Sequence, residues 1–263
     1  MSFSPQVLAV QAYSFRRRML SWKALPALMV ALVPTFMALV FRFFAPHEQG
    51  GTPTPYRMYG EILAPMCLYF VLPFLSMLVM LPILGELYEK GAIAYLLTRP
   101  APRWVPLLGL YSGGLLALLP LAVLCATLPA LILSPISGGV ELRFWLQRVV
   151  FLSLVLWIGA APYGALCLFL GVWSRKAVLW ALALLIGWGS IAGSITGPLR
   201  ALSPHRYLFG LLRNWLDLSN TLGQFSVPDP DPPGTLLSLL VLAGYVLAFL
   251  VLAYQAIRTR DVL

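Results

Sequence analysis

Charged residues gather in the stretch from Gly85 to Trp104, which lies between two long apolar runs. Two carboxylates come first and three cations follow: Glu86, Glu89, Lys90, Arg99 and Arg103. The helix dipole favours acidic residues near the start of a helix and basic residues near its end, and Pro100 stops a helix. The pattern predicts a short amphipathic helix over 86–99 whose chemistry is ion pairing and docking in a groove of a partner. A solvated connector between two spans is the alternative interpretation.

The sequence lacks the residues that metal, haem or nucleotide chemistry requires. Its two histidines, His47 and His205, fall in segments that we expect outside the membrane, and it has no H-E-x-x-H zinc motif. Its three cysteines form no C-x-x-C pair, and no lysine follows a glycine as a P-loop requires. We therefore expect no catalytic residue, metal or cofactor in this chain. If a nucleotide drives the protein, another polypeptide binds it.

The composition indicates an all-α membrane protein. Of the 263 residues, 60% are hydrophobic and 10% are charged, whereas about a quarter of the residues in a typical soluble domain are charged. The net charge of +9 would suggest nucleic-acid binding in a soluble protein. Lys and Arg flanking membrane spans explain it better here, so no nucleic acid is expected. The apolar runs are continuous rather than alternating, which favours helices over a barrel.

Apolar runs of about twenty residues are long enough to cross the roughly 30 Å hydrocarbon layer as helices. They predict one transmembrane domain with six spans, over residues 24–44, 62–85, 106–133, 149–173, 177–196 and 235–257. Six spans place both termini on one side. The short turn Ser174-Arg175-Lys176 marks that side as cytoplasmic, because Lys and Arg concentrate in cytoplasmic loops.

The cores of these spans contain no Asp, Glu, Lys, Arg or His. Ion-coupled carriers usually keep such groups at mid-membrane, so the pattern argues against a proton-coupled carrier. A sodium-coupled carrier that uses backbone carbonyls stays open.

Two segments outside the spans have a pattern of their own. Residues 3–20 predict an interfacial helix that ends in a basic cluster, with a flexible basic tail as the alternative. The residues expected at the membrane interface are Arg16, Arg17, Arg18 and Trp22. Residues 197–234 form a predicted outer loop with a short amphipathic helix over 204–218. Its proline-rich part, Pro228–Gly234, cannot continue a helix and must be extended or turned, and docking of a periplasmic partner there is a hypothesis.

Small residues recur at four-residue spacing in the predicted fifth span: Gly189, Gly193 and Gly197. A stripe of this kind lets two helix backbones approach closely. It predicts a helix contact, either between two copies of the chain or within one subunit.

The segment after span two resembles that of permease subunits of type-2 ABC exporters. Those proteins carry a stretch such as Glu-x-x-x-Gly-Thr-Ile-x-x-Leu-Leu-(Ser/Thr)-Arg-Pro-x-x-Arg between spans two and three. The matching positions here are Glu86 or Glu89, Gly91, Ile93, Leu96, Leu97, Thr98, Arg99, Pro100 and Arg103, and Ala92 replaces the usual Thr. The predicted interfacial helix, six spans and long outer segment before span six extend the resemblance over most of the chain.

The resemblance implies a permease that pairs as a homodimer in the bacterial cytoplasmic membrane and binds two separate P-loop ATPase subunits. The helix over 86–99 would act as the coupling helix, and ATP and Mg²⁺ would bind the ATPase partners. The coupling contact would involve Glu86, Glu89, Lys90, Gly91, Arg99, Pro100 and Arg103. The resemblance also implies that the glycine stripe lies near the dimer interface.

We therefore expect an ATP-driven exporter permease that is not itself an enzyme. A membrane anchor or assembly subunit without a transport path is the alternative. The substrate is not specified by the sequence.

Overall fold

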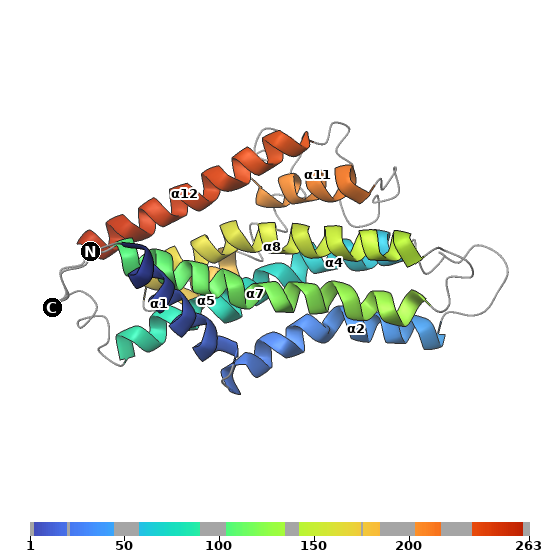
Figure 1. Cartoon of the computed structure of the whole chain (residues 1–263), viewed down its shortest axis with the longest axis horizontal. Helices are drawn as coiled ribbons and strands as arrows, with labels where there is room; N and C mark the ends of the chain where they lie inside the picture. The colour runs from blue at the N-terminus through green and yellow to red at the C-terminus, as the bar shows by residue number, and fades with distance from the viewer. Residues whose placement is uncertain are drawn as a thin grey trace.

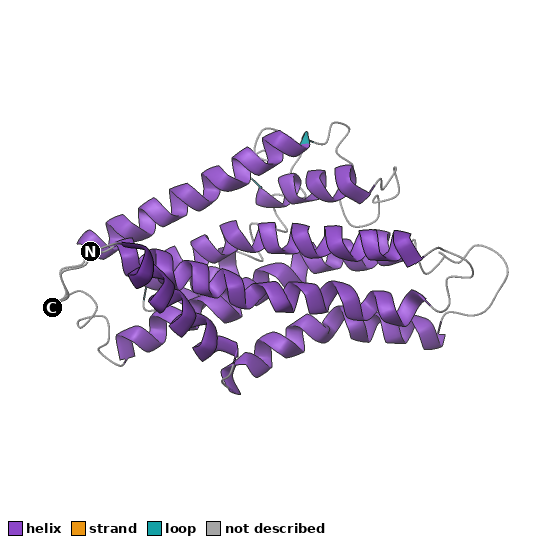
Figure 2. Ribbon diagram, in the orientation of Figure 1, coloured by secondary structure: helices purple, strands orange, loops and turns teal. Residues whose placement is uncertain are grey.

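A computed structural model describes residues 3–19, 22–44, 58–89, 104–134, 142–174, 176–184, 203–216 and 233–259. Every regular element within these ranges is a helix (Figure 2). The expectation of an all-α protein is confirmed for this part of the chain.

Five helices are long and apolar enough to cross a membrane, and each coincides with an expected span. They are α2 (Leu25–Phe44), the helix that contains Ala64–Pro82, α7 (Trp104–Leu133), α8 (Leu142–Trp173) and α12 (Thr235–Thr259). The remaining expected span, 177–196, begins with the short helix α9 (Ala177–Leu182). Residues 185–196 lie outside the described residues, so the sixth span stays a prediction.

Three helices form the centre of the bundle. α7 and α8 pack against each other, and α5 (Leu72–Glu89) packs against both. The apolar window in Ala64–Pro82 is 72% buried, against 22% for Leu25–Phe44 and 17% for Thr235–Thr259. α2 packs on α7 and α5 at one side, and α12 packs on α8 at the other (Figure 1).

The outer helices expose large apolar side chains. Phe36 of α2 and Leu240 of α12 are among many that are exposed. Such surfaces are unfavourable in water and typical of helices that face lipid or another membrane protein. The exposed surface of the bundle therefore fits a membrane protein.

The helix before α5 contains two wider turns. It passes from Met58 through the π-helical segment η2 (Tyr59–Leu63), α4 (Ala64–Met66) and the π-helical segment η3 (Cys67–Val71) into α5. The Ala64 amide donates to the Tyr59 carbonyl, and the Leu72 amide donates to the Cys67 carbonyl. Pro65 and Pro73 follow these amides directly. Because proline cannot donate the next backbone hydrogen bond, the helix widens there instead of breaking.

Two helices extend beyond the predicted limits of their spans. We expected span two to end at Gly85 and a separate coupling helix to begin at Glu86, but α5 runs without a break to Glu89. We expected the fourth span to begin at Val149, but α8 begins at Leu142 and so includes Arg148. Charge marks where the apolar run ends, and it does not by itself end a helix.

The two ends of the described chain lie at the same end of the bundle. α1 (Phe3–Met19) lies obliquely across that end, and α12 finishes there (Figure 1). A short helix, α11 (Pro204–Leu216), packs on α8 and α12 farther along the bundle. It agrees with the amphipathic helix predicted over 204–218, of which residues 217 and 218 lie outside the described residues.

Candidate functional site

The N-terminal helix α1 is held tightly on α7 by two glycines. A Cβ atom added at Gly109 would lie 2.7 Å from Val10 Cβ, and one at Gly113 would lie 2.7 Å from the Gln11 carbonyl oxygen and from Ser14 Cβ. No real side chain fits at such distances, so the two backbones approach as closely as glycine allows. The predicted interfacial helix is therefore fixed on the bundle.

The basic end of α1 presents its three arginines in different surroundings. Arg16 is exposed. Arg17 donates a 2.6 Å hydrogen bond from Nη1 to the Tyr13 hydroxyl and lies 5.7 Å from the centre of that ring. Arg18 is only 7% exposed. The cluster therefore runs from the surface into the bundle.

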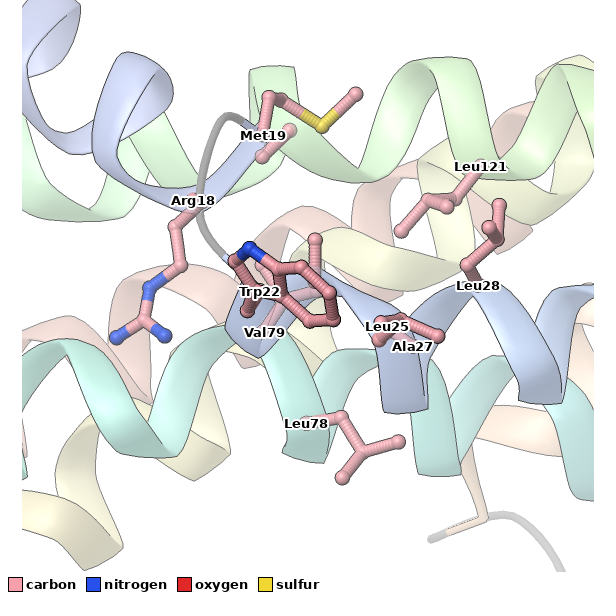
Figure 3. Close-up of a pocket in the computed structure, with 11 residues that line it drawn as sticks. Arg18, Met19, Trp22, Leu25, Ala27, Leu28, Leu78, Val79 and Leu121 are labelled. Atoms are coloured by element: carbon pink, nitrogen blue, oxygen red, sulfur yellow. The ribbon is translucent and has the colours of Figure 1, made fainter.

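A pocket of about 380 Å³ lies where the chain turns from α1 through the 3₁₀ turn η1 (Trp22–Ala24) into α2. We call it the elbow pocket. Met19 of α1 and Ala24 of η1 add to its lining. α2, α5 and α7 complete its wall with apolar side chains: Leu25, Ala27, Leu28, Leu78, Val79, Ala117 and Leu121. Figure 3 shows the Trp22 indole among these side chains and Arg18 at one side. Arg18 is the ionisable residue among those that line the pocket.

The chemistry of the elbow pocket is that of binding. Its lining offers no nucleophile and no acid–base pair. It joins an apolar volume of ligand size to a cation, and such a combination suits an amphiphile. Two of the residues expected at the membrane interface, Arg18 and Trp22, lie at this one place.

A second cluster surrounds a histidine at the beginning of α11. His205 is 4% exposed, and the Tyr163 hydroxyl of α8 forms a hydrogen bond with its Nδ1 atom. The ring centre of His205 lies 4.8 Å from that of Tyr69 and 5.5 Å from that of Tyr163. Tyr69 also contacts Phe209, with ring centres 4.8 Å apart. The sequence placed His205 in an outer loop, whereas the structure buries it where α11, α8 and η3 meet.

Burial lowers the pKa of His205 to about 4, and the backbone of Tyr69 opposes part of that shift. The Tyr69 carbonyl is the group to which Pro73 cannot donate, because proline lacks the amide hydrogen. The helix widening at η3 thus leaves a polar backbone group beside the histidine. The Nε2 atom itself makes no hydrogen bond to the described residues. His205 is neutral at ordinary pH and fastens α11 to the bundle.

A third group of buried polar atoms lies between η2, α7 and α8. The Tyr59 hydroxyl donates a 2.8 Å hydrogen bond to the Ala126 carbonyl, and its ring packs edge-on to Trp145 at 5.6 Å. Arg148, one turn beyond Trp145, is 9% exposed. The Cys67 and Cys125 sulfurs are 3.5 Å apart, and both thiols are free. This group was not predicted, because the expected span limits at 62 and 149 left Tyr59, Trp145 and Arg148 outside the spans and no local pattern connects them.

The residues predicted to contact an ATPase lie mostly outside the described part of the chain. Glu86 and Glu89 belong to the last turn of α5. The others fall beyond the described residues: Lys90, Gly91, Arg99, Pro100 and Arg103. Gly189, Gly193 and Gly197 also lie outside the described residues. Of the residues expected at the membrane interface, Arg18 and Trp22 line the elbow pocket, whereas Arg16 is exposed and Arg17 contacts Tyr13.

Two further features were not predicted, and the sequence carries a signal for one of them. Gly109 and Gly113 have the four-residue spacing that is typical of a close helix contact, but such a contact was predicted only for Gly189, Gly193 and Gly197. The surroundings of His205 had none, because Tyr69 and Tyr163 are distant in sequence.

The comparison with family profiles identifies the chain. A profile described as "Protein of unknown function (DUF2705)" matches residues 19–263, from the last residue of α1 to the end of the sequence. The comparison with curated proteins gives no significant match. Because the profile covers most of the chain, this protein belongs to the DUF2705 family.

Proposed function

We propose that this protein is the membrane-spanning permease subunit of an ATP-driven exporter. The observation that supports this most directly is the continuity of α5 from the membrane-spanning region through Glu86 and Glu89. These are the first residues of the segment that resembles a coupling helix. α5 stays helical past its internal Pro82, so a force applied at its end can be transmitted toward the membrane-spanning part.

The packing of α5 gives that force a route into the bundle. α5 contacts α7 and α8, the two helices at the centre, and also α2. Displacement at Glu89 would therefore shift the core rather than a peripheral loop. The nucleotide chemistry belongs to two separate P-loop ATPase subunits, because no lysine of this chain follows a glycine.

A second copy of the chain completes the proposed transporter. α2 and α12 bury little of their apolar surface within one subunit, which leaves wide faces for another copy and for lipid. The substrate path would lie between the two copies, in the bacterial cytoplasmic membrane, with both termini and the Glu86–Arg103 segment on the cytoplasmic side. In this arrangement the chain forms the substrate path, and the partner subunits hydrolyse ATP.

Native mass spectrometry of the tagged chain, purified in mild detergent from its own cell, tests this function. Two copies of the chain with two P-loop ATPase subunits are the expected result. In the double variant Glu89→Gln, Arg99→Gln the ATPase subunits should be lost. Arg258→Gln, an exposed cation at the end of α12, is the matched control and should retain them.

The same measurement distinguishes the alternative. The chain alone, or with partners that lack a P-loop, would contradict the exporter and favour a membrane anchor or assembly subunit. Retention of the ATPase subunits by the double variant would contradict the coupling residues while leaving the exporter standing.

A further inference from the structure

We propose that the elbow pocket binds one anionic phospholipid, with an acyl chain in the pocket and the phosphate beside the Arg16–Arg18 cluster. The site is part of this chain's own fold. It does not rest on the exporter function.

The pocket opens toward the place where lipid would be. Leu25 and Leu28 line it and yet are 39% and 38% exposed. They lie on α2, whose apolar window is only 22% buried within the chain. Ala27, Val79 and Ala117, by contrast, are buried and form the floor. An acyl chain can therefore enter from the bilayer along α2 and reach a fixed apolar surface.

The charge at the mouth favours a negative head group. Residues 3–24 contain four cations and no Asp or Glu: Arg16, Arg17, Arg18 and Lys23. Arg18 lines the pocket itself, and Arg16 is exposed beside it in sequence. Basic clusters beside a membrane helix attract anionic lipids electrostatically. A zwitterionic or neutral lipid would gain the apolar contact without this attraction.

The position of the pocket in the chain fits the membrane interface. Trp22 is 88% exposed and stands at the pocket between the basic end of α1 and the apolar α2. Exposed tryptophans are typical of the head-group region. The Gly109–Gly113 contact fixes α1, so the arginines and the apolar wall keep one relative position. A preformed arrangement of this kind makes a discrete site rather than a diffuse charged surface.

Native mass spectrometry of the delipidated full chain with added phosphatidylglycerol or phosphatidylcholine tests the proposal. We expect one phosphatidylglycerol to bind in preference to phosphatidylcholine. Leu28→Trp fills the pocket and should abolish this preference. Its matched control is Leu32→Trp, one turn along α2, equally exposed at 37% but outside the pocket. It should bind as the unmodified chain does.

The charge is tested separately. Arg18→Gln should weaken phosphatidylglycerol binding about fivefold, the effect expected from one lost cation at an anionic surface. Arg18→Lys should restore most of it, and Arg258→Gln should have no effect. Circular dichroism and a thermal midpoint would verify that each variant is folded.

Three results would overturn the inference. Equal binding of the two lipids would refute the anionic head group. Equal loss in Leu28→Trp and Leu32→Trp would refute the acyl chain in the pocket. Displacement of the lipid by inorganic phosphate alone would show a head-group contact without the pocket. Any of these would return the arginines to a general interfacial role.

Discussion

His205 should make the docking of α11 sensitive to acid. The folded protein holds its pKa at about 4, chiefly because burial disfavours the charged imidazolium, and its ordinary value is 6.5. Between these two values the undocked or unfolded chain binds a proton that the folded chain does not. The contribution of His205 to the free energy of unfolding is therefore complete above about pH 7 and is lost as the pH falls toward 4. Each pKa unit corresponds to about 1.4 kcal/mol, so the total loss is about 3 kcal/mol.

Thermal unfolding in a neutral detergent at several pH values between 7.5 and 4 measures this loss. Tryptophan fluorescence is a suitable probe, because Trp215 of α11 packs against Phe151 of α8 with ring centres 5.8 Å apart. Carboxylates also titrate in this range, so the informative quantity is the difference between the unmodified chain and His205→Gln. His47→Gln, which changes the other histidine of the chain, is the matched control.

The expected result is that His205→Gln removes about 3 kcal/mol of the acid-induced loss, while His47→Gln leaves it unchanged. If His205→Gln kept the full pH dependence of the unmodified chain, then His205 would already be accessible to protons in the folded state. The burial and the hydrogen bond to Tyr163 would not describe its surroundings in the membrane, and the reasoning would be refuted.

Three further predictions concern packing and coupling. Gly113→Leu should destabilise the docking of α1 by about 1–3 kcal/mol and speed tryptic cleavage near the arginines of α1. The control is Gly244→Leu on α12, where an added Cβ meets nothing within 4 Å, and equal effects of the two variants would refute the close contact. Gly85→Pro should interrupt α5 and reduce substrate-coupled ATPase activity in the proposed complex with the ATPase still bound, whereas Gly85→Ala keeps the helix and the activity; unchanged activity in the proline variant would contradict transmission through α5. Tyr59→Phe removes the buried hydrogen bond to the Ala126 carbonyl and should lower the free energy of unfolding in detergent by about 0.6–1 kcal/mol; a thermal midpoint equal to that of the unmodified chain would show that the bond adds no stability.

The spans could be predicted from the sequence because a bilayer imposes one simple requirement. A run of about twenty apolar residues in a bilayer must make its backbone hydrogen bonds internally, and it does so by forming a helix. α2, α7 and α12 accordingly begin and end within two residues of the predicted limits. The predicted limits at Gly85 and Val149 were set by charge, and the helices extend beyond both. Neither Glu86 nor Arg148 breaks a helix: α5 continues through Glu86, and α8 begins before Arg148.

The candidate sites were less predictable because they depend on contacts between distant residues. The basic cluster at Arg16–Arg18 was visible, but its pocket required α5 and α7 to lie beside α2. The burial of His205 required η3 and α8, which are contributed by residues far earlier in the chain. Local patterns can name such residues, but only the packing shows what surrounds them.

The glycine contact between α1 and α7 has a consequence for biogenesis. α1 leaves the ribosome before α7, because Gly109 and Gly113, which form the surface it packs on, follow about a hundred residues later. At synthesis rates of about 5–20 residues per second, α1 waits roughly 5–20 s for its partner. During that interval the arginines can hold it at the head groups, and the first and third spans become linked only when α7 has entered the bilayer. α1 is thus made before α7 but takes its final place only after α7 has been made.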